Sequence, residues 1–326
     1  MLYYLKKCGH QELGSVGIDG KPHRGRYLLT SMNNDVLRMF PPLSTTQLND
    51  SALLAIVSLY SGKKVYCNFV YHNDKFHGST ASHPRNEYRL YLNKGIENNQ
   101  LLFKTDDIVI IRKGKYKETE NIEQDILYLD IVKPLENETL YKRLDWIVEN
   151  SNIKGGYALY NGIISEFEEK VSKINIQIEV VVDKTVTEKI EHEAKVSDLF
   201  SASTFRDFVM VGYQNLCAVT GTVIRSQNYI NLEAAHIKPR SHGGLYLPNN
   251  GLALSRDMHW AFDKGFFTID NSYKIIVHEA IDSSYLNSFN RKTIRIPRDD
   301  FFKPNIENLE YHRRNIFGLF LQTGRL

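Results

Sequence analysis

The distribution of apolar residues over the first 135 positions favours β-structure. Short runs rich in β-branched and aromatic residues, separated by clusters of glycine, proline and asparagine, predict strands. These runs lie at 27–32, 64–72, 87–92, 106–114 and 125–132. Apolar residues at helical spacing from Thr46 to Tyr60 predict one amphipathic helix among them. Many strands with a single helix predict a β-pseudobarrel over residues 1–135.

The pattern changes beyond residue 135. From about Leu140 to Ser172 apolar residues recur at helical spacing, and from Lys170 to Lys195 the chain is dense in Lys and Glu. The second stretch is typical of a linker that carries an isolated strand or hairpin. A further helix is expected from about Asp198. We therefore expect an α+β, multidomain protein, with the pseudobarrel at 1–135, a helical connector and linker at 136–197, and a C-terminal domain at 198–326.

Composition limits where the protein works and what it binds. The formal charge of +3 over 326 residues excludes a polycation, so any nucleic-acid surface must be a local basic patch. Three widely spaced cysteines offer neither a disulfide framework nor a CxxC pair, which is typical of a reducing cytoplasm. The N-terminus has no signal-peptide layout and no apolar run reaches membrane-spanning length. We expect a cytoplasmic protein with no membrane partner.

Candidate chemistry is concentrated between Cys217 and Gly265, in the segments CAVTG, LEAAHIKPR and NNGLALSRDMHWAFDKG. His236 ends a short apolar strand expected at 230–237 and is followed by a glycine-rich loop and Asn250. A helix is expected from Leu252 onward, on which His259 and Asp263 are four residues apart and share a face. A neutral imidazole can take a proton from water, and an imidazole with a carboxylate suits Mg²⁺ or Mn²⁺.

These segments resemble the HNH endonucleases, in particular the branch whose first strand reads AAHI and whose last element reads HxxFDxG. The resemblance implies a ββα-metal nuclease domain that requires Mg²⁺ or Mn²⁺ and leaves a 5′-phosphate and a 3′-hydroxyl. It also implies that His236 is the general base, that Asn250 orients the loop and the base, and that His259 and Asp263 hold the cation. An isolated histidine in a strand is usually structural, so the weight rests on the joint order of these residues.

Two positions depart from the commonest pattern of the family. Many relatives have an Asp or His directly before the base, as a metal ligand, where this chain has Ala235. The third ligand is then Glu233, one pair further back on the strand, or water. Many relatives also bind a structural zinc through two CxxC pairs, but this region has only Cys217, so no structural zinc is expected. In the loop, Arg240 and His242 are candidate phosphate contacts, although solvated loop residues are the alternative.

The N-terminal half contains a second informative segment. Arg85, Glu87 and Arg89 alternate with Asn86 and Tyr88, so a strand would present two guanidinium groups and a carboxylate on one face. Arginine can read guanine, and glutamate can accept a hydrogen bond from the amino group of cytosine. A salt-bridge ladder between strands is the alternative.

This segment resembles the effector-binding domain of EcoRII-type restriction endonucleases, in which a YxNxxFxGxTRNExR pattern lies on a DNA-facing strand. The matching residues, with an insertion from Thr80 to Pro84, are Tyr71, Asn73, Phe76, Gly78, Arg85, Asn86, Glu87 and Arg89. Residues 4–29 and 36–43 resemble the opening strand and the LFP segment of that domain. The resemblance implies a DNA-recognition pseudobarrel with the contact residues His23, Arg26, Tyr27, Asn73, Lys75, Arg85, Asn86, Glu87 and Arg89.

Together these features predict a type II restriction endonuclease that hydrolyses double-stranded DNA. One HNH site cuts one strand, so double-strand cleavage requires a homodimer or two sequential nicks, and the helical connector could carry the dimer contact. The alternative within the class is a modification-dependent (type IV) enzyme for methylated, hydroxymethylated or phosphorothioate DNA, with Tyr71, Phe76 and Tyr88 around a modified base. The alternative from another class is a DNA-binding regulator with an inactive nuclease, which Ala235 favours.

Overall fold

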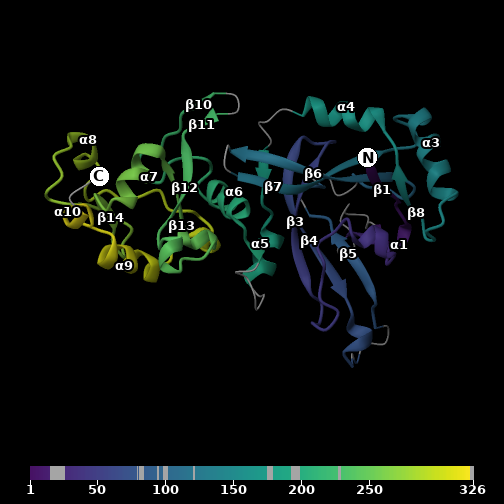
Figure 1. Ribbon diagram of the computed structural model, residues 1–326, viewed down its shortest axis with the longest axis horizontal. Helices are drawn as coiled ribbons and strands as arrows, with labels where there is room; N and C mark the ends of the chain where they lie inside the picture. The colour runs from purple at the N-terminus through teal and green to yellow at the C-terminus, as the bar shows by residue number, and fades with distance from the viewer. Residues whose placement is uncertain are drawn as a thin grey trace, which may run out of the picture. The chain divides into compact units, whose positions relative to one another are not determined.

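The chain forms two compact units, Met1–Lys189 and Ile190–Leu326, each described here by itself. The structure is a computed structural model (Figure 1). It describes residues 1–14, 26–78, 80, 84–93, 95–97, 102–119, 122–174, 179–191, 199–226 and 229–323. None of the helices in these ranges combines the length and the apolar character that crossing a membrane requires.

The first unit is built on one twisted sheet of nine strands (Figure 1). The strands are β1 (Leu2–Lys7), β2 (Tyr27–Thr30), β3 (Ser51–Ser58), β4 (Lys63–His72), β5 (Glu87–Tyr91), β6 (Ile108–Thr119), β7 (Ile122–Val132), β8 (Tyr157–Asn161) and β9 (Glu179–Val181). Their order is β2-β5-β4-β3-β7-β6-β1-β8, and β9 pairs with β4. The β3–β7 and β4–β9 pairs are parallel and the others antiparallel.

Helices lie at the margins of this sheet. They are α1 (His10–Leu13), α2 (Asn34–Leu37), η1 (Asp74–Phe76), α3 (Glu138–Glu149), α4 (Ser165–Lys173) and α5 (Lys184–Glu191). Helix α3 packs against β1 and β8, and Phe167 of α4 meets Tyr3 of β1 edge to face. Burial of aromatic and β-branched side chains on the sheet forms the core of the unit, including a stack of Phe40 on Phe69 at 4.7 Å.

The helix expected from Thr46 to Tyr60 is wrong. Strand β3 occupies Ser51–Ser58 and pairs with β4 on one edge and β7 on the other. Its run of consecutive apolar residues, with the β-branched Ile56 and Val57 fully buried, is typical of a central strand covered on both faces. Short apolar runs do not distinguish a strand from a buried helix by spacing alone.

The segment 136–197, expected to be a connector, contributes to the sheet of the first unit. Strand β8 lies between α3 and α4 and pairs with β1 over its full length. Strand β9 extends the edge of β4 that β5 leaves free. Residues up to Lys189 therefore belong to the first compact unit.

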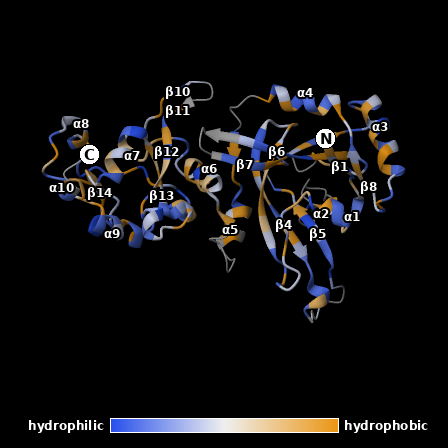
Figure 2. Ribbon diagram, viewed as in Figure 1, coloured by the Kyte–Doolittle hydropathy of each residue, from blue (hydrophilic) through white to orange (hydrophobic). Residues whose placement is uncertain are grey.

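The second unit is a mixed α+β domain around a β-hairpin followed by a helix. Its elements are α6 (Ala202–Gly212), β10 (Arg225–Ser226), β11 (Tyr229–Ile230), β12 (Leu232–His236), η3 (Arg240–His242), η4 (Pro248–Asn250), β13 (Gly251–Ser255), α7 (Arg256–Asp263), β14 (Phe267–Ile269), β15 (Ile275–Val277), α8 (Ser284–Asn287), η5 (Asp300–Phe302), α9 (Ile306–Asn315) and α10 (Phe320–Thr323). Apolar residues along β12 (Figure 2) join β13, α6 and α7 in a single buried cluster.

The helix expected from Leu252 begins four residues later. Residues 251–255 form β13, which pairs with β12 in antiparallel register, and α7 starts at Arg256. The five residues of β13 are all buried. Hydrogen bonds to β12 satisfy the backbone N–H and C=O groups of β13, so these buried residues do not need helical hydrogen bonds.

Candidate active site

The hairpin and helix of the second unit bring the residues of the nuclease motif together. His236 ends β12 opposite Gly251 of β13, and Glu233 lies three residues earlier, opposite Leu254. Helix α7 follows β13 directly, so His259 returns to the hairpin and contacts Glu233. A strand, a strand and a helix in immediate succession thus bring His259 next to Glu233, on the strand that His236 ends.

His236 lies between aromatic rings. The ring of Phe205 from α6 stacks on its imidazole at a centroid distance of 4.3 Å, and Tyr246 meets it edge to face at 5.3 Å. Its Nε2 is buried and makes no hydrogen bond to the described residues. Burial lowers the pKa of His236 to about 4, and the charges of Arg240 and His259 act in the same direction. The imidazole is therefore unprotonated at neutral pH, the form that a general base needs.

Asn250 holds the two ends of the loop that follows His236. Its Oδ1 accepts from the backbone N–H of Lys238 at 2.9 Å, and its Nδ2 donates to the carbonyls of Lys238 at 3.1 Å and Leu245 at 2.9 Å. A side chain at Gly244 would overlap the Lys238 carbonyl oxygen, so only glycine fits there. This closed loop fixes the backbone that carries His236.

His259 lies between two carboxylates. Its Nδ1 is 2.8 Å from Oε2 of Glu233, and its Nε2 is 3.3 Å from Oδ2 of Asp263, one helical turn further along α7. Glu233 also forms an ion pair with Arg256 at 3.2 Å. Burial raises the pKa of Asp263, and Glu233 adds to this effect while His259 opposes it.

The donor set fits a hydrated divalent cation with few protein ligands. Neighbouring ligands of an octahedral ion with bonds of about 2.1 Å lie roughly 3 Å apart, close to the separation of His259 Nε2 from Asp263 Oδ2. The carboxylate of Glu233 instead faces the other ring nitrogen, as carboxylates that orient a ligating histidine do. Within the described ranges, no group of three or more His, Cys, Asp or Glu side chains is arranged to hold a metal ion. Mg²⁺ commonly takes one or two carboxylates and completes its shell with water and phosphate oxygens.

Ala235 and Cys217 belong to the framework of the domain. Ala235 is fully buried in the core of the second unit. The sulfur of Cys217 is also buried and accepts from the backbone N–H groups of Thr220 and Ser255.

One comparison with known protein families agrees with this geometry. Residues 217–270 match the family model described as HNH endonuclease. The chain contains an HNH endonuclease domain. Among solved structures, one match is titled a modification-dependent TagI restriction endonuclease; it is 16% identical, covers 76% of this chain and 61% of that chain, and has a TM-score of 0.31. The chain thus spans less than two thirds of that protein. No curated protein matches.

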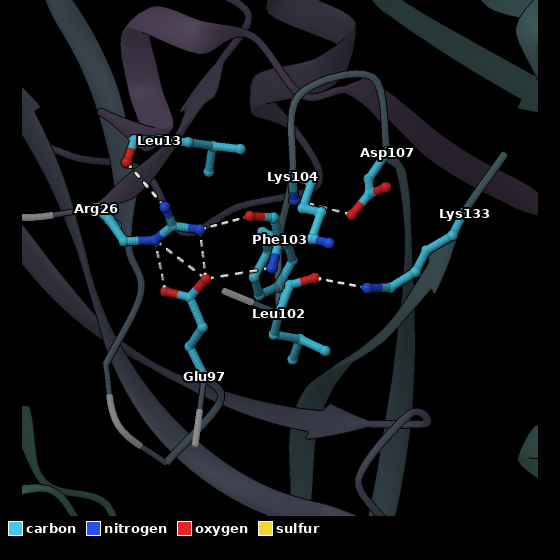
Figure 3. Close-up of polar contacts among 8 residues, drawn as sticks. All are labelled: Leu13, Arg26, Glu97, Leu102, Phe103, Lys104, Asp107 and Lys133. Atoms are coloured by element: carbon cyan, nitrogen blue, oxygen red, sulfur yellow. Dashed lines mark hydrogen bonds and ion pairs between the residues drawn. The ribbon is translucent and has the colours of Figure 1, made fainter. Parts of the chain in front are cut away.

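Two of the DNA contacts expected in the first unit are framework residues instead. Arg26 is only 5% exposed, and its guanidinium donates to both oxygens of Glu97 and to the carbonyls of Leu13 and Phe103 (Figure 3). Asn73 is fully buried; its amide donates to the carbonyls of Thr45 and Gln47. Their hydrogen-bonding capacity is used inside the unit, so we correct their assignment.

The remaining candidates lie near one another on β5 and the turn before it, but mostly in internal pairs. Arg85 donates to Asp74 at 2.7 Å, and Arg89 pairs with Glu87 and lies 4.0 Å over the ring of Tyr27.

Of the other expected contacts in the first unit, Tyr27 is itself buried. Asn86 accepts from the hydroxyl of Tyr71 at 2.8 Å, and Lys75 is exposed. His23 lies outside the described residues.

The aromatic pocket considered for a modified base is not formed. The rings of Tyr71 and Tyr88 stack directly on each other at 4.3 Å, leaving no slot between them, and Phe76 is exposed. A different cavity of about 450 Å³ is lined by residues 29–33 and 152–154 with Glu87 and Tyr157. Of these residues, the sequence analysis had singled out only Glu87.

Sequence reasoning also missed the residues that surround the base. Phe205 lies on α6, before the matched segment, and its apolar character at helical spacing predicts a core position, with no sign that it faces His236. Tyr246 also contacts Arg240. The guanidinium of Arg240 lies 4.3 Å over the ring of Tyr246 and donates to the carbonyl of Gly244. Only the concentration of basic and aromatic residues after His236 indicates these contacts in advance.

Proposed function

We propose that the chain is a DNA endonuclease of a restriction system, with His236 as general base and Mg²⁺ or Mn²⁺ held by His259 and Asp263. The observation that carries the proposal is the pairing, in one HNH domain, of a neutral, half-buried imidazole with a histidine–aspartate pair at the separation of two ligands. Double-stranded DNA is the proposed substrate.

In the proposed reaction, His236 accepts a proton from the attacking water, and Asn250 keeps the loop in place so that the imidazole stays aligned. Glu233 accepts from Nδ1 of His259 and thereby turns Nε2 toward Asp263. A bound divalent cation supplies neutralisation of the charge that develops on the phosphate. This assignment moves Glu233 from metal ligand to positioning residue.

The mode of DNA selection has two candidates. In the type II reading, Arg85, Glu87 and Arg89 on β5 read unmodified base edges, but both arginines are already paired with carboxylates of their own unit. In the modification-dependent reading, an extruded base enters the cavity beside Glu87; Arg89 pairs with Oε1 of Glu87, so Oε2 is the atom that can accept from an exocyclic amino group. We favour the second reading because cavities of this size accommodate small ligands and because the arginines would have to exchange partners to read bases.

The test is a cleavage assay with Mg²⁺ or Mn²⁺ on matched plasmids, one unmodified and one carrying methylated, hydroxymethylated or phosphorothioate DNA. Wild type and His236→Ala are compared on both. Cleavage of the modified plasmid alone, lost in the variant, supports the favoured reading, and discrete fragments from unmodified DNA support the type II reading. DNA binding without cleavage of either plasmid would contradict the nuclease proposal and support the regulator.

Double-strand cleavage by one HNH site per chain requires either two copies or two successive nicks. Accumulation of nicked plasmid before linear plasmid indicates independent nicks, whereas direct conversion to linear plasmid indicates a homodimer. The same assay therefore tests the expected dimer.

A further inference from the structure

Basic and aromatic side chains adjoin the general base, and α9 contributes one that lies outside the matched HNH segment. The Nζ of Lys238, two residues beyond His236, lies 4.8 Å over the ring of Tyr311 in α9. The imidazole of His242 meets the same ring at 5.8 Å. Tyr311 thus lies between two basic side chains of the loop that Asn250 fixes.

These polar groups have no anionic partner in the part of the chain that the structure describes. Lys238 and Arg240 form no ion pair with the described residues, and no hydrogen bond joins the Tyr311 hydroxyl to any of them. The chain has no Asp or Glu from Ala234 to Arg256. An unpaired cluster of this kind attracts an anion in water.

The opposite arrangement is found elsewhere on the same helix. Arg314 pairs with Glu310 at 3.7 Å, and Arg313 donates to the carbonyl of Ile269 at 2.7 Å. The arginines of α9 are therefore engaged within the domain, and unpaired positive charge is found on the side that meets the loop.

We propose that Lys238, His242 and Tyr311 form a strip that binds the phosphate backbone of the DNA strand beside the cleaved bond. Tyr311 acts in two ways: its ring holds the Lys238 ammonium over the strip, and its hydroxyl donates to a phosphate oxygen. Phosphate oxygens accept from lysine and tyrosine side chains alike in protein–DNA interfaces. This inference rests on the proposed function, because it assigns the substrate strand of the same site.

The experiment measures DNA binding separately from cleavage. In the His236→Ala background, the affinity for a short mixed-sequence DNA duplex is measured by fluorescence anisotropy over a range of KCl concentrations. Each lysine–phosphate contact contributes about 0.9 to the slope of log affinity against log salt. We expect Lys238→Gln to reduce this slope by about 1, and Tyr311→Phe to weaken binding while leaving the slope unchanged. Tyr311→Leu should reduce the slope as well, because it releases the lysine.

The matched control is Lys292→Gln. Lys292, like Lys238, lies over an aromatic ring of the same unit, 5.6 Å from the ring of Phe289, although Lys292 is exposed and Lys238 is half-buried; this substitution should leave the slope unchanged. Equal slopes for Lys238→Gln and Lys292→Gln would overturn the strip. Cleavage by the unsubstituted chain reports on the proposed function independently: cleavage with an unaltered Lys238→Gln slope rejects the strip alone. A reduced slope without cleavage rejects the nuclease reading and leaves a phosphate-binding surface.

Discussion

In the first unit, the arginines that the sequence nominated for DNA contact are paired with acids of their own unit: Arg26 with Glu97, Arg85 with Asp74 and Arg89 with Glu87. In the second unit, Lys238 and Arg240 rest on tyrosine rings and form no ion pair with the described residues. DNA that binds the second unit gains an unopposed attraction, whereas DNA that binds β5 must displace an internal carboxylate. The difference suggests that the nuclease unit supplies affinity and that the first unit supplies discrimination.

The largest expected effect is on the unpaired histidine of the second unit. His236→Ala should lower the cleavage rate by about 10²–10⁴-fold, the usual contribution of a general base, with DNA affinity preserved. Single-turnover cleavage measures the rate, and anisotropy measures the affinity. An equal loss of DNA affinity would mean that His236 binds DNA as Lys238, His242 and Tyr311 are proposed to do, and would contradict its separate role as general base.

The buried pair of the first unit should be the most sensitive to truncation. Arg26→Ala leaves the carboxylate of Glu97 buried without its partner and should destabilise the unit by about 3–5 kcal/mol. Arg85→Ala is the control, because its ion pair is partly exposed and should contribute little to stability.

Unfolding in urea is followed by tryptophan fluorescence. The chain has two tryptophans, Trp146 in the first unit and Trp260 in the second, so Trp260→Phe in every variant restricts the signal to the first unit. Equal stability of the Arg26 and Arg85 variants would contradict the framework role of Arg26. Arg85→Ala should instead weaken DNA binding if β5 faces the duplex.

Within the described part of the chain, the second unit itself contains one histidine with an unbonded ring nitrogen, His236, and one whose ring nitrogens are both hydrogen-bonded, His312. His312 is buried against Phe262 at 3.7 Å, and unlike His236 it uses both ring nitrogens, toward Thr268 and the Phe262 carbonyl. Burial lowers the pKa of His312 to about 4. The unfolded chain, with a histidine pKa of about 6.5, then binds the proton first as the pH falls.

Stability should consequently be complete above pH 6.5 and decline by up to about 3 kcal/mol as the pH falls from about 6.5 to 4. Urea unfolding of Trp146→Phe, in which Trp260 reports on the second unit, measures this decline at successive pH values. His312→Asn should remove the part of the decline that His312 causes and leave the part that His236 causes, because burial lowers the pKa of His236 to about 4 as well. An equally steep decline in that variant would assign the pH dependence to other groups.

The smallest expected effect concerns Glu233. If it orients His259, Glu233→Gln should raise the Mg²⁺ concentration needed for half-maximal cleavage by about 10–100-fold and leave the rate at saturating Mg²⁺ largely intact. Asp263→Asn, at a proposed ligand, should lower the saturated rate as well. If both variants lower the rate at saturating Mg²⁺ equally, Glu233 is a metal ligand and not a positioning residue.

The sequence was most informative where local order carries the chemistry. The order of His236, Asn250, His259 and Asp263 predicted two strands and a helix in succession, and such a unit needs only a few dozen residues to assemble. The strands at 64–72, 87–92 and 125–132 were likewise confirmed by their β-branched and aromatic content.

Contacts between distant segments could not be predicted. The partner of Arg26 is 71 positions away, and an arginine on a strand looks the same in sequence whether it faces DNA or a buried carboxylate. The run around Ile56 and Val57 fits helical and strand spacing alike, and only its neighbours β4 and β7 decide between them. Phe205 was missed because its contact with His236 joins two segments that are far apart in the sequence.

Helix α6 has a consequence for how this nuclease could be transplanted. The ring of Phe205 and the side chain of Val209 fill the space beside His236 and Gly251, yet both residues precede Cys217, where the recognisable motif begins. A graft cut at the motif borders would carry every reactive group and lose the apolar side chains that pack against one face of the imidazole and fix its position. Recombination between such enzymes should therefore preserve activity only when the junction falls before Ala202.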